Sequence, residues 1–132
     1  KHRIGAISFY VDNIHYNLLV KILNDRYGIQ VRGGCSCAGT YGHYLLHVDQ
    51  NYSNKITEKI SHGDLSEKPG WVRLSLHPTM SNDEVYFITS AIKETILNID
   101  VWNKDYNYDI HTNEFFHKSQ SANDFDFIKK WF

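Results

Sequence analysis

The chain has 132 residues, of which 42% are hydrophobic and 14% aromatic, and its formal net charge is −1. This length and composition suit one domain with its own hydrophobic core. The balanced charge argues against a broad basic surface for nucleic acid or for an anionic membrane, and no apolar run approaches the roughly 20 residues of a membrane span. We therefore expect neither nucleic acid nor a membrane as a partner.

The two cysteines, Cys35 and Cys37, are separated by one residue. A disulfide between them would close only a small, strained ring, and a disulfide framework needs more cysteines at wider spacing. We therefore expect a reducing compartment and a cytoplasmic protein. The chain begins without methionine and its first strand is expected almost at once, which indicates a piece of a longer protein.

The first third of the chain predicts a strand, a helix and a second strand. Residues 4–11 alternate apolar and polar side chains as a half-buried strand does. Asp12 and Asn13 can cap a helix that ends at Gly28. Its apolar residues recur at helical spacing, at Tyr16, Leu19, Val20, Leu23 and Tyr27. Residues 29–32 predict a short strand that leads directly into the sequence RGGCSCAGTYGH.

The middle of the chain predicts two helices, a loop and a strand. Residues 38–48 repeat apolar side chains every three or four positions, so the cysteines are expected at the N-terminal end of a short helix. A second helix is expected at residues 53–63, followed by a loop at 64–70 with Pro-Gly turn chemistry. Residues 71–77 alternate cleanly as a strand, with Arg73 on its polar face.

The last third begins with the sequence SNDE at residues 81–84, which is typical of a capping box and predicts a long amphipathic helix to about Asn98. After Asp100 the composition changes to aromatic residues separated by Asn, Asp and Lys. We expect one domain at residues 1–100 and an aromatic-rich extension at 101–132 that packs on it, with a terminal helix capped near Asn123.

Helices and strands alternate along the chain, and the connections between the middle strands are short. A parallel sheet needs long crossover connections. The sequence therefore predicts an α/β (α+β) fold with a small, at least partly antiparallel sheet packed with helices.

Two stretches carry a resemblance to a known family. They are GIQVRGGCSCAG at residues 28–39, followed by Tyr-Gly-His at 41–43, and KPGWVRLS at 68–75. At this spacing they resemble the C-terminal small domain of class V aminotransferases, the pyridoxal-phosphate enzymes that include cysteine desulfurases and selenocysteine lyases. The resemblance covers roughly residues 4–98, and the aromatic run to about His117 resembles the tail of less-characterised members.

The resemblance implies a large domain that this sequence lacks. In the family that domain precedes the small one and carries the lysine that holds pyridoxal 5'-phosphate. The His117-Lys118 pair lies after the small domain, and we interpret it as surface chemistry. The chain would thus be the C-terminal domain of an enzyme that acts on an amino acid. It would be inactive alone, and its parent would be a homodimer.

Cys37 is the first site residue that the resemblance implies. In desulfurases the matching cysteine attacks the sulfur of a cofactor-bound cysteine, becomes a persulfide and releases alanine. Such a nucleophile must be a thiolate, which a helix N-terminus, Arg32 and His43 could each favour. In the alternative, Cys37 only lines the cofactor cleft of a transaminase, an epimerase or another lyase. Cys35 departs from the usual desulfurase pattern and is either a resolving or a structural cysteine.

Arg73 matches the arginine that binds the substrate α-carboxylate in the family. A guanidinium is planar and can bind a carboxylate through two hydrogen bonds, which suits this role. The alternative is an ordinary solvated arginine on a strand. We interpret Arg32, on the preceding strand, as a residue that orients the cysteine loop.

A small metal-binding module is the alternative from another class of protein. Cys35, Cys37, His43 and His47 supply two thiols and a histidine pair, which is a complete set of four ligands. Structural zinc sites, however, usually place two to four residues between the cysteines and a longer gap before the histidines. The spacing therefore favours a site without a metal.

Overall fold

The computed structural model describes residues 5–35, 44, 46–47 and 49–119. Its first sheet has three antiparallel strands in the order β1 (Ala6–Phe9), β3 (Trp71–Ser75) and β2 (Arg32–Gly34). The helices are α1 (Tyr16–Tyr27), α3 (Gln50–Ser61) and α4 (Asn82–Trp102). A short 3-10 turn, η1 (Asn103–Asp105), leads into an antiparallel hairpin of β4 (Tyr106–Asp109) and β5 (Glu114–His117). This mixture of helices and small antiparallel sheets confirms the predicted α+β class.

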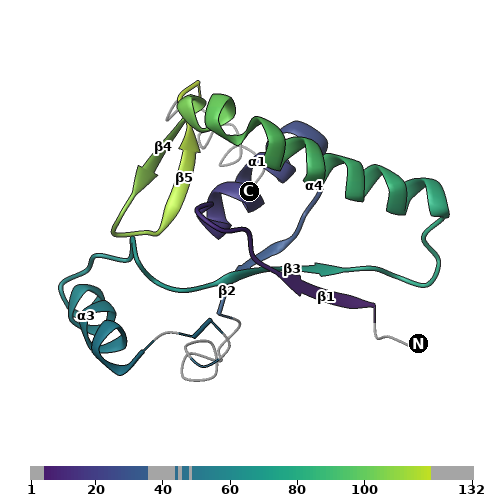
Figure 1. Ribbon diagram of the computed structural model, residues 1–132. Helices are drawn as coiled ribbons and strands as arrows, with labels where there is room; N and C mark the ends of the chain where they lie inside the picture. Colours follow the sequence, from purple (N-terminus) through teal and green to yellow (C-terminus); the bar gives the residue numbers. More distant parts are fainter. Residues whose placement is uncertain (1–4, 36–43, 45, 48, 120–132) are drawn as a thin grey trace, which may run out of the picture.

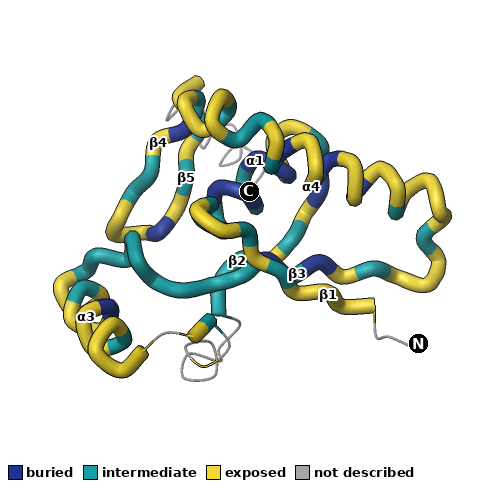
Figure 2. Tube along the Cα trace, viewed as in Figure 1, coloured by how far each residue is buried: buried dark blue, intermediate teal, exposed yellow. Residues whose placement is uncertain are grey.

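Helices α1 and α4 lie over one face of the three-stranded sheet, and the hairpin stands beside α1 (Figure 1). Helix α3 lies apart from this layer, at the end of the molecule below the hairpin. Figure 2 shows that buried residues gather on α1, on β3 and on one side of α4, whereas α3 is mostly exposed. Among the described residues, no helix is both long enough and apolar enough to cross a membrane.

Helix α1 confirms the predicted helix, but its cap corrects the prediction. Gly28 has a φ of 66° and donates its N–H to the Asn24 carbonyl at 2.9 Å, so it ends the helix as expected. The N-cap is His15, whose Nδ1 accepts a hydrogen bond from the N–H of Asn17 at 3.1 Å. The expected caps, Asp12 and Asn13, precede this position. A histidine in its neutral form can therefore replace the usual Asp, Asn or Ser at an N-cap.

The second strand lies further along the chain than predicted. The sequence pattern predicts a strand at residues 29–32, but β2 covers Arg32–Gly34. The N–H of Ile29 donates to the Leu23 carbonyl at 3.1 Å, so this residue completes the end of α1 instead of pairing with another strand. Its side chain is buried in the core. Strand pairing begins only after the chain has left the helix.

The later elements match their predictions more closely. The capping box at Ser81 and Glu84 is present, and α4 continues to Trp102, four residues beyond the predicted end. Helix α3 starts at Gln50, earlier than expected, because Asp49 caps it by accepting the N–H of Tyr52 at 2.9 Å. The helix expected at residues 38–48 and the terminal helix near Asn123 lie largely or wholly outside the described residues.

Helix α1 is buried on two sides. One side contributes Leu19 and Leu23 to the main core with Val72 of β3 and Ala91 of α4. The other side contributes Leu18 and Ile22 to a second cluster with Tyr106 of the hairpin, against which Ile99, Trp102 and Phe115 pack. The helix thus joins the sheet to the hairpin.

A polar contact also fixes the hairpin to α1. The Tyr106 hydroxyl donates to the Asp25 carboxylate at 3.2 Å. Burial and the nearby charge of Asp25 raise the pKa of Tyr106 to about 12. Nearby, the Arg26 guanidinium lies 4.0 Å from the centre of the Trp102 ring, a cation–π contact between α1 and α4. The C-terminal ends of α1 and α4 are therefore held to the hairpin by apolar and polar contacts together.

Ile22→Ala tests whether the second cluster stabilises the fold. Ile22 is fully buried, whereas Leu97 on α4 is 74% exposed. We expect Ile22→Ala to lower the free energy of unfolding by about 2–5 kcal/mol, because it removes buried methyl groups and leaves a cavity. Leu97→Ala is the control and should change the free energy of unfolding by less than about 0.5 kcal/mol. Urea unfolding followed by circular dichroism measures both, and equal losses would contradict the second core.

His15 makes the stability of α1 depend on pH. Its ring stacks on Tyr16 with centroids 4.6 Å apart and lies near Tyr108 and Phe115. Among the described residues, its buried Nε2 has no hydrogen-bond partner. Burial lowers the pKa of His15 from its ordinary value of 6.5, and the nearby Asn113 side chain offsets part of this shift. Protonation would also remove the Nδ1 acceptor and place a positive charge at a helix N-terminus, where the helix dipole opposes it.

We expect the stability that His15 confers to be lost in mild acid. The unfolded chain takes up the proton at a higher pH than the folded chain, so the unfolded state binds more protons in this window and stability rises with pH through it. The contribution is complete above about pH 6.5 and is lost as the pH falls below this value. His15→Asn keeps a cap acceptor without titrating there, so its unfolding free energy should fall less between about pH 7 and 5. Identical pH dependence in both proteins would contradict the role of His15.

Candidate functional site

The polar face of the three-stranded sheet brings the two predicted arginines together. Arg73 lies on the central strand, directly opposite Ser8 of β1 on one side and Arg32 of β2 on the other. Directly opposed residues project from the same face of a sheet. Trp71 and Ser75 share this face with Arg73 by alternation along β3. Helices α1 and α4 cover the opposite face, where Val72 and Leu74 are buried (Figure 1).

Neither arginine has a carboxylate partner among the residues that the structure describes. The ion pairs found there, Lys21–Asp25, Arg26–Asp105 and Lys59–Glu67, lie elsewhere. Arg73 is partly buried and Arg32 is exposed. Two opposed arginines destabilise a strand pair, since like charges face each other across about 5 Å between Cβ atoms. A bound anion would remove this repulsion, so the face is suited to a carboxylate or another small anion.

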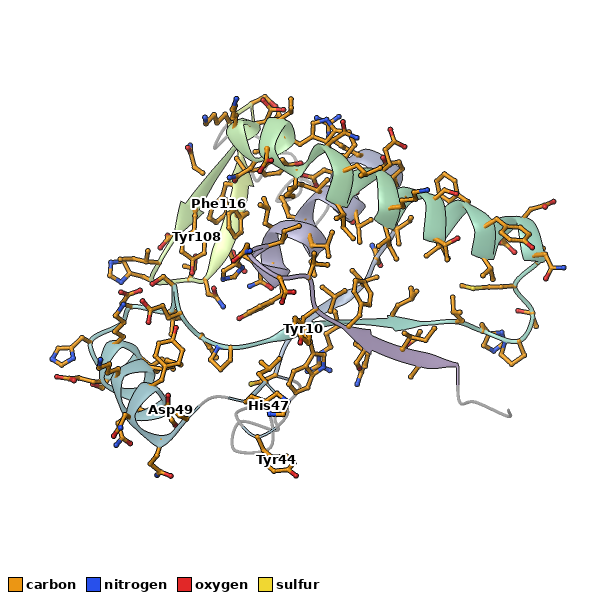
Figure 3. All side chains as sticks on the ribbon, in the orientation of Figure 1. Tyr10, Tyr44, His47, Asp49, Tyr108 and Phe116 are labelled. Atoms are coloured by element: carbon orange, nitrogen blue, oxygen red, sulfur yellow. The ribbon has the colours of Figure 1, made fainter. Side chains whose placement is uncertain are left out.

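The cysteine loop leaves this face directly. Gly34, the last residue of β2, pairs with Trp71 and has a φ of 115°, a conformation that suits glycine. Cys35 follows as a partly buried free thiol. Beyond the loop, Tyr44 and His47 appear below the sheet, on the side opposite α1 and α4 (Figure 3). The chain thus enters the loop beside the arginines.

Cys37 and His43 lie outside the described residues, so the nucleophile and its histidine neighbour stay predictions. The metal-binding alternative, which needs both of them, stays a prediction as well. Among the described residues, no group of three or more His, Cys, Asp or Glu side chains could hold a metal ion. His47 is exposed and has a φ of 52°.

The Tyr16 ring packs against Gly33 of β2 and against Gly70, just before β3, close to where the cysteine loop begins. A Cβ atom added at Gly70 would stand 2.5 Å from the Tyr16 ring, and one added at Gly33 would stand 3.0 Å from it. The ring therefore packs directly against the backbone of β2 and against the residue that precedes β3. Burial raises the pKa of Tyr16, the hydrogen bond from Asn113 lowers it, and the charge of Cys35 raises it. Tyr16 thus contacts β2, the strand that ends just before Cys35.

The described lysines are all at least partly exposed, whereas a lysine that holds pyridoxal phosphate has to lie in an enclosed pocket. Lys118, from the His-Lys pair, is exposed and its ammonium donates to the Lys104 carbonyl.

Three residues that lie next to β2, or contact residues that do, are not predicted from the sequence: His15, Tyr16 and Asn113. Tyr16 appears there only as a helix residue, His15 is not singled out, and Asn113 lies in the aromatic extension. A positive φ of 59° at Asn113 is typical of turns, which favour asparagine. The preference of turns for asparagine is the one local signal in the sequence, and it does not predict a contact with Tyr16, 97 positions away.

Arg32→Gln tests the repulsion between the opposed arginines. We expect it to raise the free energy of unfolding by about 0.2–1 kcal/mol at low salt, because like charges no longer face each other. The gain should shrink in about 1 M salt, where the screening length is short. Lys93→Gln, on the exposed surface of α4, is the matched control and should show no such gain. A loss of stability in Arg32→Gln would mean that the two guanidinium groups do not repel each other.

Comparison with protein-family models matches residues 1–87 to aminotransferase class V. This stretch holds all three strands of the first sheet, the cysteine loop and the start of α4, and it ends before the hairpin. Neither the curated proteins nor the solved structures contain a significant match. The family model covers 87 of the 132 residues, including both arginines of the polar face and both cysteines. The chain therefore belongs to the class V aminotransferase family.

Proposed function

We propose that the chain is the C-terminal small domain of a pyridoxal-phosphate enzyme that removes sulfur from an amino acid, with Cys37 as the sulfur acceptor. The observation that carries this proposal is the position of Arg73. It lies on the central strand of a polar sheet face, without a carboxylate partner among the described residues, and its neighbouring strand leads into the cysteine loop.

Arg73 binds the α-carboxylate of the substrate in this proposal. Its strand is held on both sides, by β1 and by β2, so the sheet fixes the face from which the Arg73 side chain projects. Because the charge has no competing carboxylate among the described residues, a substrate can pair with it without displacing an internal ion pair. Arg32 adds a second positive charge at the same face and favours the approach of an anion.

Cys37 takes up the sulfur. Its thiolate attacks the substrate sulfur, so an S–S bond forms and the bond between sulfur and the substrate Cβ breaks. The electron pair of the broken bond stays on the carbon, which takes up a proton and leaves as alanine. The sulfur remains on Cys37 as a persulfide. A thiolate is required because a neutral thiol is a poor nucleophile.

The remaining parts of the enzyme lie outside this chain in the proposal. Class V aminotransferases in general use pyridoxal phosphate, which a large domain of the same parent would hold. We further propose that the parent is a cytoplasmic homodimer and that the small domain alone is inactive. In a transaminase, an epimerase or another lyase of the family, Arg73 would keep its role and Cys37 would not act as a nucleophile.

Two substitutions in the full-length protein test the proposal. Cys37→Ser should abolish persulfide formation, because serine is barely ionised near neutral pH. Arg73→Lys should raise the substrate KM by about 5- to 150-fold, because lysine keeps the charge but loses the two-point contact. Mass spectrometry detects the persulfide, and steady-state kinetics give KM.

Arg26→Lys is the matched control, since Arg26 contacts Trp102 on the other side of the molecule. It should leave both readouts unchanged. Normal turnover of an amino acid by Cys37→Ser would exclude sulfur abstraction and favour a transaminase, an epimerase or another lyase. An unchanged KM in Arg73→Lys would show that Arg73 does not bind the substrate α-carboxylate.

A further inference from the structure

We propose that a groove between α1 and the hairpin binds a short, basic peptide in extended form, which adds a strand to the free edge of β5. The hairpin stands beside α1 (Figure 1), and the groove is a cavity of about 560 Å³, a volume typical of ligand-binding pockets. It is lined by one side of α1, by Gln30 and Val31 before β2, and by residues 114–116 of β5. The groove includes neither Arg32 nor Arg73, so this inference does not rest on the proposed function.

The floor of the groove is a third side of α1, which faces neither of the two cores. Asn17, Lys21 and Asn24 lie there at intervals of four and three residues, which places them on one helix face. Asn17 and Asn24 each donate one hydrogen bond within the chain through Nδ2, and their Oδ1 atoms accept none from a described residue. Gln30 adds a third amide side chain. Amide groups can bond to the donors and acceptors of a peptide, so this floor suits a peptide ligand.

Strand β5 has one edge that no strand among the described residues covers. It pairs only with β4, in a two-stranded sheet. Just beyond the strand, the N–H of Lys118 donates to the Asp105 carbonyl at 2.8 Å. Because hydrogen-bonded and non-hydrogen-bonded pairs alternate along antiparallel strands, Phe116 and Glu114 bond to β4, and the N–H and C=O of Phe115 point away from it. Phe115 also lines the groove, so this free edge opens into it.

The opposite wall of the groove also carries unpaired main chain. Gln30 and Val31 belong to no strand, and no main-chain hydrogen bond joins either of them to another described residue. Unpaired N–H and C=O groups at a strand edge are a template for another strand. A two-stranded hairpin gains from a third strand, because it is marginal alone. The groove thus provides the free edge and the polar floor that an added strand needs.

The charges that line the groove favour a basic peptide. Glu114 is exposed and has no ion-pair partner among the described residues. Lys21 also lines the groove, but its ammonium already pairs with Asp25 at 3.1 Å. The Glu114 carboxylate is therefore left to pair with a lysine or an arginine of the ligand. An exposed pair of this kind selects among peptides more than it strengthens binding, which the main-chain pairing supplies.

NMR spectroscopy of the 132-residue chain tests the proposal with the peptide Ac-Lys-Val-Lys-Val-Lys-NH2. We expect the Phe115 amide proton to exchange rapidly with solvent in the free protein. It should exchange at least about tenfold more slowly with the peptide bound, because the added strand gives this N–H an acceptor. Two further peptides carry N-methyl groups on the lysines or on the valines. Since pairing along one edge uses every second N–H, one of them should bind at least about fivefold more weakly, the loss of one hydrogen bond.

Glu114→Gln tests the preference for a basic peptide. It should weaken binding of the lysine peptide by about two- to fivefold at low salt, the effect of one exposed ion pair. It should not weaken binding of Ac-Glu-Val-Glu-Val-Glu-NH2. Glu58→Gln is the matched control, since it makes the same change at an exposed position on α3, and it should leave the affinity unchanged. Neither side chain is buried, so both variants should fold.

Four results would overturn the inference. The first is a Phe115 amide whose exchange the lysine peptide does not slow, and the second is equal affinity of the unmodified and both N-methylated peptides. Slow exchange of this amide in the free protein would mean that another segment of the chain already pairs there. Exchange that slows with protein concentration would assign the edge to a second copy. Neither cofactor nor amino-acid substrate is present in these measurements, so none of the four results bears on the proposed function.

Discussion

The burial of α1 on two sides is the constraint on which the rest of the structure depends. Leu19 and Leu23 pack against the sheet, while Leu18 and Ile22 pack against the hairpin. A helix with a single apolar stripe covers one layer, but this helix separates two. The hairpin has only two strands, and such a unit is marginal without a partner. Its position, and with it that of Asn113, therefore depends on α1.

The same arrangement leaves one face of the sheet polar and without a covering helix among the described elements. Since α1 and α4 both lie on the side of Val72, the residues that alternate with it are free to carry charge. Arg32 and Arg73 face each other there, an arrangement that we expect to cost stability. Such a cost is typical of functional sites, where unfavourable local contacts are kept and favourable contacts elsewhere offset their cost in stability. The buried side of the sheet supplies the stability, and the polar side is the one that the proposed function uses.

The sequence predicts those features that depend on neighbouring residues. The Gly28 helix stop, the Ser81 capping box and the alternation along β3 are local, and all three are present. The alternation places Arg73 on the polar face. The second apolar side of α1 is not predicted, because Tyr16, Leu19 and Leu23 already form one apolar helix face and the pattern needs no second one. The hairpin was expected only as an extension, although YNYD, the sequence of β4, alternates as a strand does.

Features that depend on distant pairing are not in the local pattern. The register that sets Arg32 opposite Arg73 joins strands that lie far apart in the chain, and the contact of Asn113 with Tyr16 joins residues 97 positions apart. The shift of β2 to Arg32–Gly34 has a different cause, since the helix end uses the N–H of Ile29. The apolar and polar pattern of the sequence allows other registers and other strand starts. In each case a specific hydrogen bond or packing contact selects the one that the structure has.

The central claim is that the polar sheet face binds the carboxylate of an amino acid through Arg73. A crystal structure of the full-length protein with a bound amino-acid analogue tests it most directly. We expect two hydrogen bonds of about 2.7–2.9 Å from the Arg73 guanidinium to the analogue's α-carboxylate, with the cysteine loop beside its side chain. An analogue whose carboxylate is held by other residues, with Arg73 in solvent, would contradict the claim.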